Sequence, residues 1–221
     1  MKKILSILLS LALVLSLAAS GGSALAASSD VDAAEIIGIK EDNTYASEFL
    51  GIMAGFNDEY WYVLSDEETV EAMGYVADTL TNDELAEQLR SSGVVCDLYV
   101  LSLNGSGDNI NIQLENLGFL YGLAMSEEAY CKTAIPQLKT AMEQMGLTNV
   151  DIVQETIEFA GAEHCSCLLS GEYNGTEVFE RMVMVKAGNY MATVTAFSFD
   201  LESAEAMISL FEAYDAEKLA A

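Results

Sequence analysis

Hydrophobic and polar residues alternate along this chain with two different periods, and each period predicts one kind of element. In several runs every second residue is apolar, as in strands that bury one face. Turn residues such as Asp42-Asn43, Asn174-Gly175 and Gly188-Asn189 separate these runs and favour hairpins. The predicted strands are residues 35–40, 44–56, 94–103, 110–117, 150–159, 165–173, 177–186 and 190–199.

Elsewhere apolar residues recur every three or four positions, which predicts helices with one buried face. Ser65 and Glu68 form a capping box at the start of one such segment, and residues 81–84 repeat it, so either one broken helix or two short helices fit. Pro136 lies inside a second segment and predicts a kink or a restart there. The predicted helical segments are residues 65–93, 126–146 and 201–214.

The predicted order is two strands, a helix, two strands, a helix, four strands and a helix. Hairpins separated by single helices are typical of an α+β fold, here a mostly antiparallel sheet with about three helices packed on it. The chain has one proline and no low-complexity stretch, so residues 35–221 are expected to form a single domain. Residues 27–34 are small and polar and predict a flexible arm before it.

Residues 1–26 have the features of a signal peptide. Two lysines precede an apolar run that ends at Ala19, which is shorter than the about 20 residues that span a bilayer. Ala24-Leu25-Ala26 offers a cleavage site. Residues 17–22 are ordinary leader composition or a decayed lipoprotein box in which Ser20 replaces the lipid-bearing cysteine. A serine hydroxyl cannot form the thioether, so we expect a secreted protein with no membrane contact after cleavage.

The composition excludes some partners. The chain has 35 acidic and 9 basic residues and a formal net charge of −26, so nucleic acid and anionic lipid would be repelled. Cationic ligands and basic proteins would be attracted, although only weakly at physiological salt. The acidity also keeps an extracellular protein soluble. Because 52% of the residues are hydrophobic, we expect a folded chain.

The segment AEHCSC holds candidate redox or metal-binding residues. Neighbouring residues of a strand point to opposite faces, so His164 and Cys165 cannot act together as a base and a nucleophile. Cys165 and Cys167 share a face, and a disulfide from either to Cys96 or Cys131 is easier than one between them. All three complete pairings, and reduced core thiols, stay open. A metal site of His164, Cys165 and Cys167 would require the histidine to turn toward the thiols.

Three consecutive aromatic residues, Tyr60, Trp61 and Tyr62, are the candidate binding residues. In a strand, Trp61 would lie on one face and both tyrosines on the other. One set belongs in the core. The other either packs at an edge or forms an exposed platform for a sugar or a peptide.

The sequence contains no P-loop, dinucleotide fingerprint, serine elbow or zinc-protease helix, and it has only one histidine. We therefore predict no cofactor and no catalytic residues, and an enzyme is disfavoured. An active site made of carboxylates needs no short motif, so a hydrolase of that kind remains an alternative.

Three stretches resemble the PsbP-like and DcrB-like proteins, a group of secreted or lipid-anchored bacterial proteins. NTYASEFLGI is similar to the opening hairpin of that fold, CDLYVLSLNGSGDNINIQLENL to its central hairpin, and GEYNGTEVFERMVMVKAGNYMATVTAFS to its closing hairpins. The resemblance implies an extracytoplasmic α+β domain and no particular site residue. The chain departs from the group at Ser20 and in lacking a proline and glycine before Trp61.

The favoured hypothesis is a non-catalytic extracytoplasmic module that binds a protein, a peptide or a cell-surface component. A metal- or redox-dependent protein that uses the cysteine and histidine cluster is the second hypothesis. A carboxylate-based hydrolase is the third.

Overall fold

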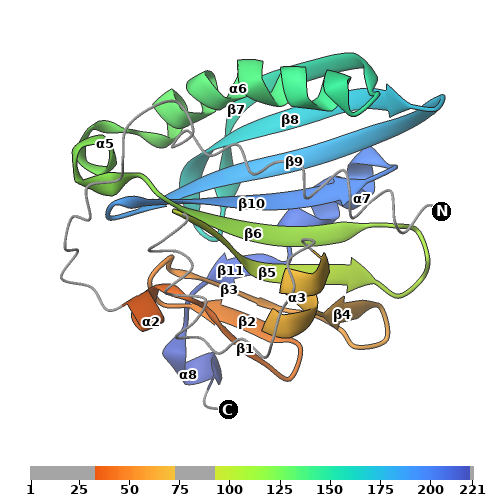
Figure 1. The fold of residues 1–221 in the computed structure, drawn as a ribbon. Coiled ribbons are helices and arrows are strands. Elements are labelled where there is room, and N and C mark those ends of the chain that lie inside the picture. Colours follow the sequence, from red (N-terminus) through yellow and green to blue (C-terminus); the bar gives the residue numbers. More distant parts are fainter. Residues whose placement is uncertain (1–32, 73–92, 220–221) are drawn as a thin grey trace.

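The computed structural model describes residues 33–72 and 93–219, whose strands form two antiparallel sheets (Figure 1). The expected signal peptide, most of the expected arm and the second capping box lie outside the described residues. The described part is α+β with mostly antiparallel strands, as the sequence predicts.

The larger sheet has seven strands in the order β4-β5-β6-β10-β9-β8-β7. Each neighbouring pair is antiparallel. Asn174 and Gly175 both have positive φ in the turn between β8 and β9, as a two-residue Asn-Gly hairpin requires. The strands are β4 (Trp61–Val63), β5 (Val94–Ser102), β6 (Asn109–Asn116), β7 (Thr148–Phe159), β8 (Ala162–Tyr173), β9 (Thr176–Ala187) and β10 (Tyr190–Ser198).

The smaller sheet has four short strands in the order β1-β2-β3-β11. Asp42 and Asn43, both with positive φ, form the predicted first turn. The last strand comes from the far end of the chain and pairs with β3, Phe211 opposite Ala54. The strands are β1 (Ile39–Glu41), β2 (Thr44–Ser47), β3 (Ile52–Gly55) and β11 (Phe211–Ala213).

Polar side chains cap the starts of two helices. The Ser126 hydroxyl accepts a hydrogen bond from the backbone N–H of Ala129, and the Asp200 carboxylate accepts one from Ser203. No helix among the described residues is both long and apolar enough to cross a bilayer. The helices are α2 (Ala33–Ile36), α3 (Asp66–Ala72), α5 (Gly118–Ala124), α6 (Glu127–Gln144), α7 (Leu201–Ile208) and α8 (Ala216–Leu219).

Two apolar clusters join three layers. Helix α6 lies across one face of the larger sheet, while the smaller sheet lies against the other (Figure 1). The first cluster fills the space between the sheets and includes Tyr45, Ile52, Val100 and Val194. The second lies between α6 and strands β8, β9 and β10, and it contains three of the four cysteines.

The structure differs from the predicted order in several places. Residues 44–56 form two strands rather than one, because Gly51 takes a positive φ in the turn between β2 and β3. The short strand β4 was not predicted. Residues 35–36 are helical rather than extended, because Ile36 and its neighbour Ile37 are both buried, which strict alternation cannot achieve. The last helix ends at Ile208, and the segment from Phe211 forms β11. Helices α5 and α8 were not predicted. Finally, α6 is continuous through Pro136, because its buried residues on both sides of the proline pack on the same sheet.

Candidate functional site

The aromatic stretch forms an exposed surface at the edge of the larger sheet. Tyr60 and Tyr62 are 56% and 44% exposed, whereas Trp61 is half-buried and packs against the core between the sheets. The predicted separation of Trp61 from the two tyrosines is therefore what the structure shows. Leu103, 51% exposed, lies opposite Tyr60 and donates its backbone N–H to the Tyr60 carbonyl at 2.8 Å.

We call Tyr60, Tyr62, Leu101 and Leu103 the β4 patch. Leu101 is half-buried and pairs with Tyr62 across β4 and β5, so all four side chains share one face of the sheet. Large apolar residues gathered at an edge strand, rather than scattered singly, are typical of interaction surfaces.

Acidic residues lie next to the β4 patch in the chain, and one of them contacts it. Asp58 and Glu59 precede it in the chain and are exposed, and Glu67 is exposed at the start of α3. The Tyr62 hydroxyl donates to Glu68 at 2.7 Å, and that carboxylate also accepts the backbone N–H of Ser65. The Ser65 bond and the Tyr62 bond lower the pKa of Glu68, which keeps it charged beside the ring. The patch therefore combines aromatic faces with negative charge.

Two of the three cysteine and histidine candidates, Cys165 and Cys167, lie beneath α6. Cys165 and Cys167 share the β8 face under α6, where Cys131 of the helix meets them. The Sγ atoms of Cys165 and Cys131 are 2.9 Å apart, and Cys131 also hydrogen-bonds Cys167. His164 points away from these thiols and packs edge-on against Phe159. Among residues 33–72 and 93–219, no three acidic, cysteine or histidine side chains are grouped to hold a metal ion.

Glu127 occupies a fork in the larger sheet. Pairing of β8 with β9 ends at Ser166, while β8 continues on β7 as far as Ala162. At the fork, the carboxylate of Glu127 accepts the backbone N–H groups of Cys165 at 3.0 Å and Lys186 at 2.9 Å. One side chain thus satisfies two strand amides that lack a strand partner.

The same carboxylate binds His164, whose Nδ1 is 3.0 Å from a Glu127 oxygen. The hydrogen bond that His164 makes to the Glu127 carboxylate raises the pKa of His164 against the opposing effect of burial. Burial raises the pKa of Glu127, but the bonds from His164 and the two amides outweigh it and lower the pKa overall. When His164 is protonated, it forms an ion pair with Glu127 that stabilises the fork.

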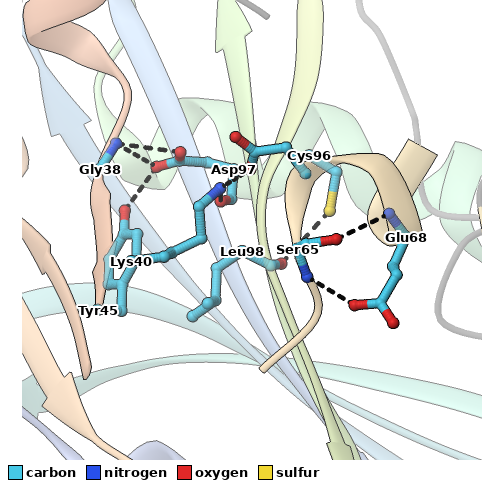
Figure 2. Close-up of polar contacts among 9 residues, drawn as sticks. Gly38, Lys40, Tyr45, Ser65, Glu68, Cys96, Asp97 and Leu98 are labelled. Atoms are coloured by element: carbon cyan, nitrogen blue, oxygen red, sulfur yellow. Dashed lines mark hydrogen bonds and ion pairs between the residues drawn. The ribbon is translucent and has the colours of Figure 1, made fainter. Parts of the chain in front are cut away.

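A third polar network joins the two sheets around Asp97, which no sequence pattern suggested (Figure 2). Asp97 is fully buried at a bulge in β5. Its carboxylate accepts the Gly38 N–H at 3.0 Å and the Tyr45 hydroxyl at 2.6 Å. Lys40 donates to the Asp97 carbonyl at 2.8 Å and forms an ion pair with Asp66. Each group that binds the carboxylate comes from the smaller sheet or the segment before it, so Asp97 holds the sheets together.

Two buried acids have raised pKa values, but they do not form a catalytic pair. Burial raises the pKa of Asp97, partly opposed by Lys40 and the hydrogen bonds to its carboxylate. Burial also raises the pKa of Glu180 to about 8. Neither Glu180 oxygen has a hydrogen-bond partner among the described residues. Asp97 is on β5 and Glu180 on β9, and β6 and β10 lie between them.

Comparisons with known proteins give no family for this chain. No protein-family model and no curated protein matches it. A protein of Bacteroides thetaiotaomicron VPI-5482 is similar over 79% of this chain and 49% of its own length, at 10% identity and a TM-score of 0.41. LpqN, involved in cell envelope biogenesis of Mycobacterium tuberculosis, is similar over 80% of this chain and 90% of its own length, at 12% identity and a TM-score of 0.40. A Pseudomonas aeruginosa protein of unknown function is similar over 43% of this chain and 61% of its own length, at 11% identity and a TM-score of 0.28.

The chain therefore spans about half the length of the first of these structures and less than two thirds of the third.

Proposed function

We propose that this chain is an exported, non-catalytic binding module whose β4 patch binds a basic segment of a protein or peptide. The observation that supports this is the exposure of Tyr60 and Tyr62 side by side on an edge strand. An extracytoplasmic, PsbP-like protein belongs to the same proposal, and it rests on the leader of residues 1–26 and on the quoted stretches.

The chemistry of the patch favours a partner with lysine or arginine. Aromatic faces attract cations, and an exposed contact of this kind contributes about 0.5–1 kcal/mol. Asp58 and Glu59, which precede Tyr60 in the chain, and Glu68, which binds the Tyr62 hydroxyl, add negative charge. The net charge of −26 raises the encounter rate with a basic partner at low salt.

Fluorescence anisotropy with a labelled hexa-arginine peptide tests the proposal, with hexaglutamate as the charge control. Replacing both Tyr60 and Tyr62 with alanine should weaken hexa-arginine binding by about tenfold, since two cation–π contacts are lost. Val153→Ala is the matched control, because Val153 is 50% exposed at the opposite edge of the same sheet. Equal weakening in the Val153 control, or none in the tyrosine variant, would overturn the assignment of the patch.

Export is tested separately. Protein recovered from the culture medium should begin at Ala27 when its N-terminus is sequenced. The full-length chain in the cytosol, with residues 1–26 intact, would contradict export but would leave the binding result unaffected.

A further inference from the structure

Three thiols meet at one point beneath α6. Cys131 projects from the helix toward β8, where Cys165 and Cys167 lie on one face, and all three are buried. Cys131 contacts both of the others. Cys96 is elsewhere, in a separate cluster with Leu64 and Tyr99, and its thiol donates to the Leu98 carbonyl.

The geometry reduces the possible pairings. Cys165 and Cys167 are two residues apart in an extended strand, so their Cα atoms are about 6.6 Å apart, near the upper limit for a disulfide. Cys131 is therefore the disulfide partner for either Cys165 or Cys167. Its Sγ atom is 2.9 Å from that of Cys165, and a small side-chain movement would bring the two sulfurs to the about 2.05 Å of a bond.

Access also favours Cys165. It is the most exposed of the three thiols, at 7% against 1% for Cys167 and 0% for Cys131. Its Sγ accepts a hydrogen bond from the half-buried side chain of Gln154, at the sheet edge formed by β7. Of the three thiols, Cys165 is therefore the one that an oxidant reaches most easily.

We propose that Cys131 and Cys165 form a disulfide that ties α6 to β8, and that Cys167 is a third thiol that exchanges into it. In the first step, the two thiols lose two protons and two electrons, and a disulfide oxidant of the oxidising compartment is reduced to two thiols. In the exchange, the Cys167 thiolate attacks the Cys131 sulfur and the Cys131–Cys165 bond breaks. The proton released by Cys167 then passes to Cys165, with no net oxidation.

The surroundings of Cys167 suit this second role. In the reduced protein, the hydrogen bond from Cys131 lowers the pKa of Cys167, burial opposes that effect, and the charge of Arg181 adds to it. Once Cys131 is in the disulfide it has no proton to donate, so the charge of Arg181 is the influence that still lowers the pKa of Cys167 during exchange. The thiolate is the form that attacks a disulfide, so a lowered pKa favours exchange.

Counting free thiols tests the pairing. The full chain, equilibrated in a glutathione redox buffer, is denatured and alkylated with N-ethylmaleimide. Of its four cysteines, two should react without reductant and four with it. Peptide mapping should show Cys131 linked to Cys165. Four reactive thiols without reductant, a link through Cys96, or a link between Cys165 and Cys167 would each overturn the proposal.

Variants separate the roles of the three thiols. Cys165→Ala should move the link to Cys131 and Cys167, whereas Cys131→Ala should abolish it. Cys96→Ala is the matched control and should keep the original link. If Cys131→Ala does not fold, the peptide map of the unaltered chain still decides the pairing. Because the buffer supplies the oxidant, the result does not depend on export or on the β4 patch.

Discussion

Glu180 allows a quantitative test of the core beneath α6. It is fully buried with its pKa raised to about 8 by burial, compared with 4.5 for an ordinary glutamate. Below about pH 4.5 both the folded and the unfolded chain carry the proton, so the group has no net effect. As pH rises toward 8, the unfolded chain loses the proton and the folded chain keeps it, so folding stability falls.

Each pH unit in this window costs about 1.4 kcal/mol, so the penalty at pH 7 is about 3 kcal/mol. Glu180→Gln removes the ionisation but keeps the size and polarity of the side chain. The free energy of unfolding of the variant should match that of the wild type near pH 4.5 and exceed it by about 3 kcal/mol at pH 7. This difference corresponds to about 1.5 M in the urea midpoint.

The assay is urea unfolding followed by circular dichroism at pH 4.5, 6, 7 and 8. Subtracting the unfolding free energy of the wild type from that of the variant at each pH removes the contribution of the other acidic groups. Glu177→Gln is the matched control, because Glu177 is exposed on the same strand, β9. A wild-type-to-variant difference that stays constant from pH 4.5 to 8 would refute the argument, since it would mean that Glu180 titrates alike in both states.

Three other substitutions test the polar networks. Asp97→Ala leaves the Gly38 N–H and the Tyr45 hydroxyl unpaired in the core. It should lower the free energy of unfolding in urea by on the order of 3 kcal/mol. A loss below about 1 kcal/mol would contradict the role of Asp97 in joining the sheets. Gly38→Ala puts a methyl group 2.3 Å from the Tyr45 ring and should lower the melting temperature, while Gly55→Ala, which meets nothing within 4 Å, should not. Equal melting temperatures for the two variants would count against that close contact. His164 has a raised pKa, so its ion pair stabilises the fold fully below about pH 6.5 and is lost as pH rises through the folded value. His164→Gln should therefore be destabilising at pH 6 and much less so at pH 9, and an equal effect at both would exclude the ion pair.

The hairpins of the larger sheet could be predicted from local signals. Asn174-Gly175 fixes its turn because both residues must adopt positive φ, and alternation on either side then sets the strands. The split between exposed Tyr60 and Tyr62 and half-buried Trp61 followed from the same period of two. That is as much of the candidate site as the sequence could give, because Leu101 and Leu103 join the two tyrosines only through the pairing of β4 with β5.

Long-range contacts account for what the sequence missed. Strand β11 is three residues long, too short for a period to appear, and it exists because Phe211 pairs with Ala54 far away in the chain. Asp97 was not suggested because it lies on a bulge, where alternation fails. The meeting of Cys131 with Cys165 depends on how α6 lies on β8, and no spacing in the sequence encodes that.

The position of Glu127 has a consequence for the placement of α6. Its two carboxylate oxygens bind amides of two different strands. Sliding the helix by one residue would break both bonds, so Glu127 fixes the position of α6 along the sheet. Cys131 is one helical turn further along the same face. Glu127 therefore also determines which thiol of β8 Cys131 reaches. A substitution of Glu127 should redirect the cross-link even though all the cysteines are retained.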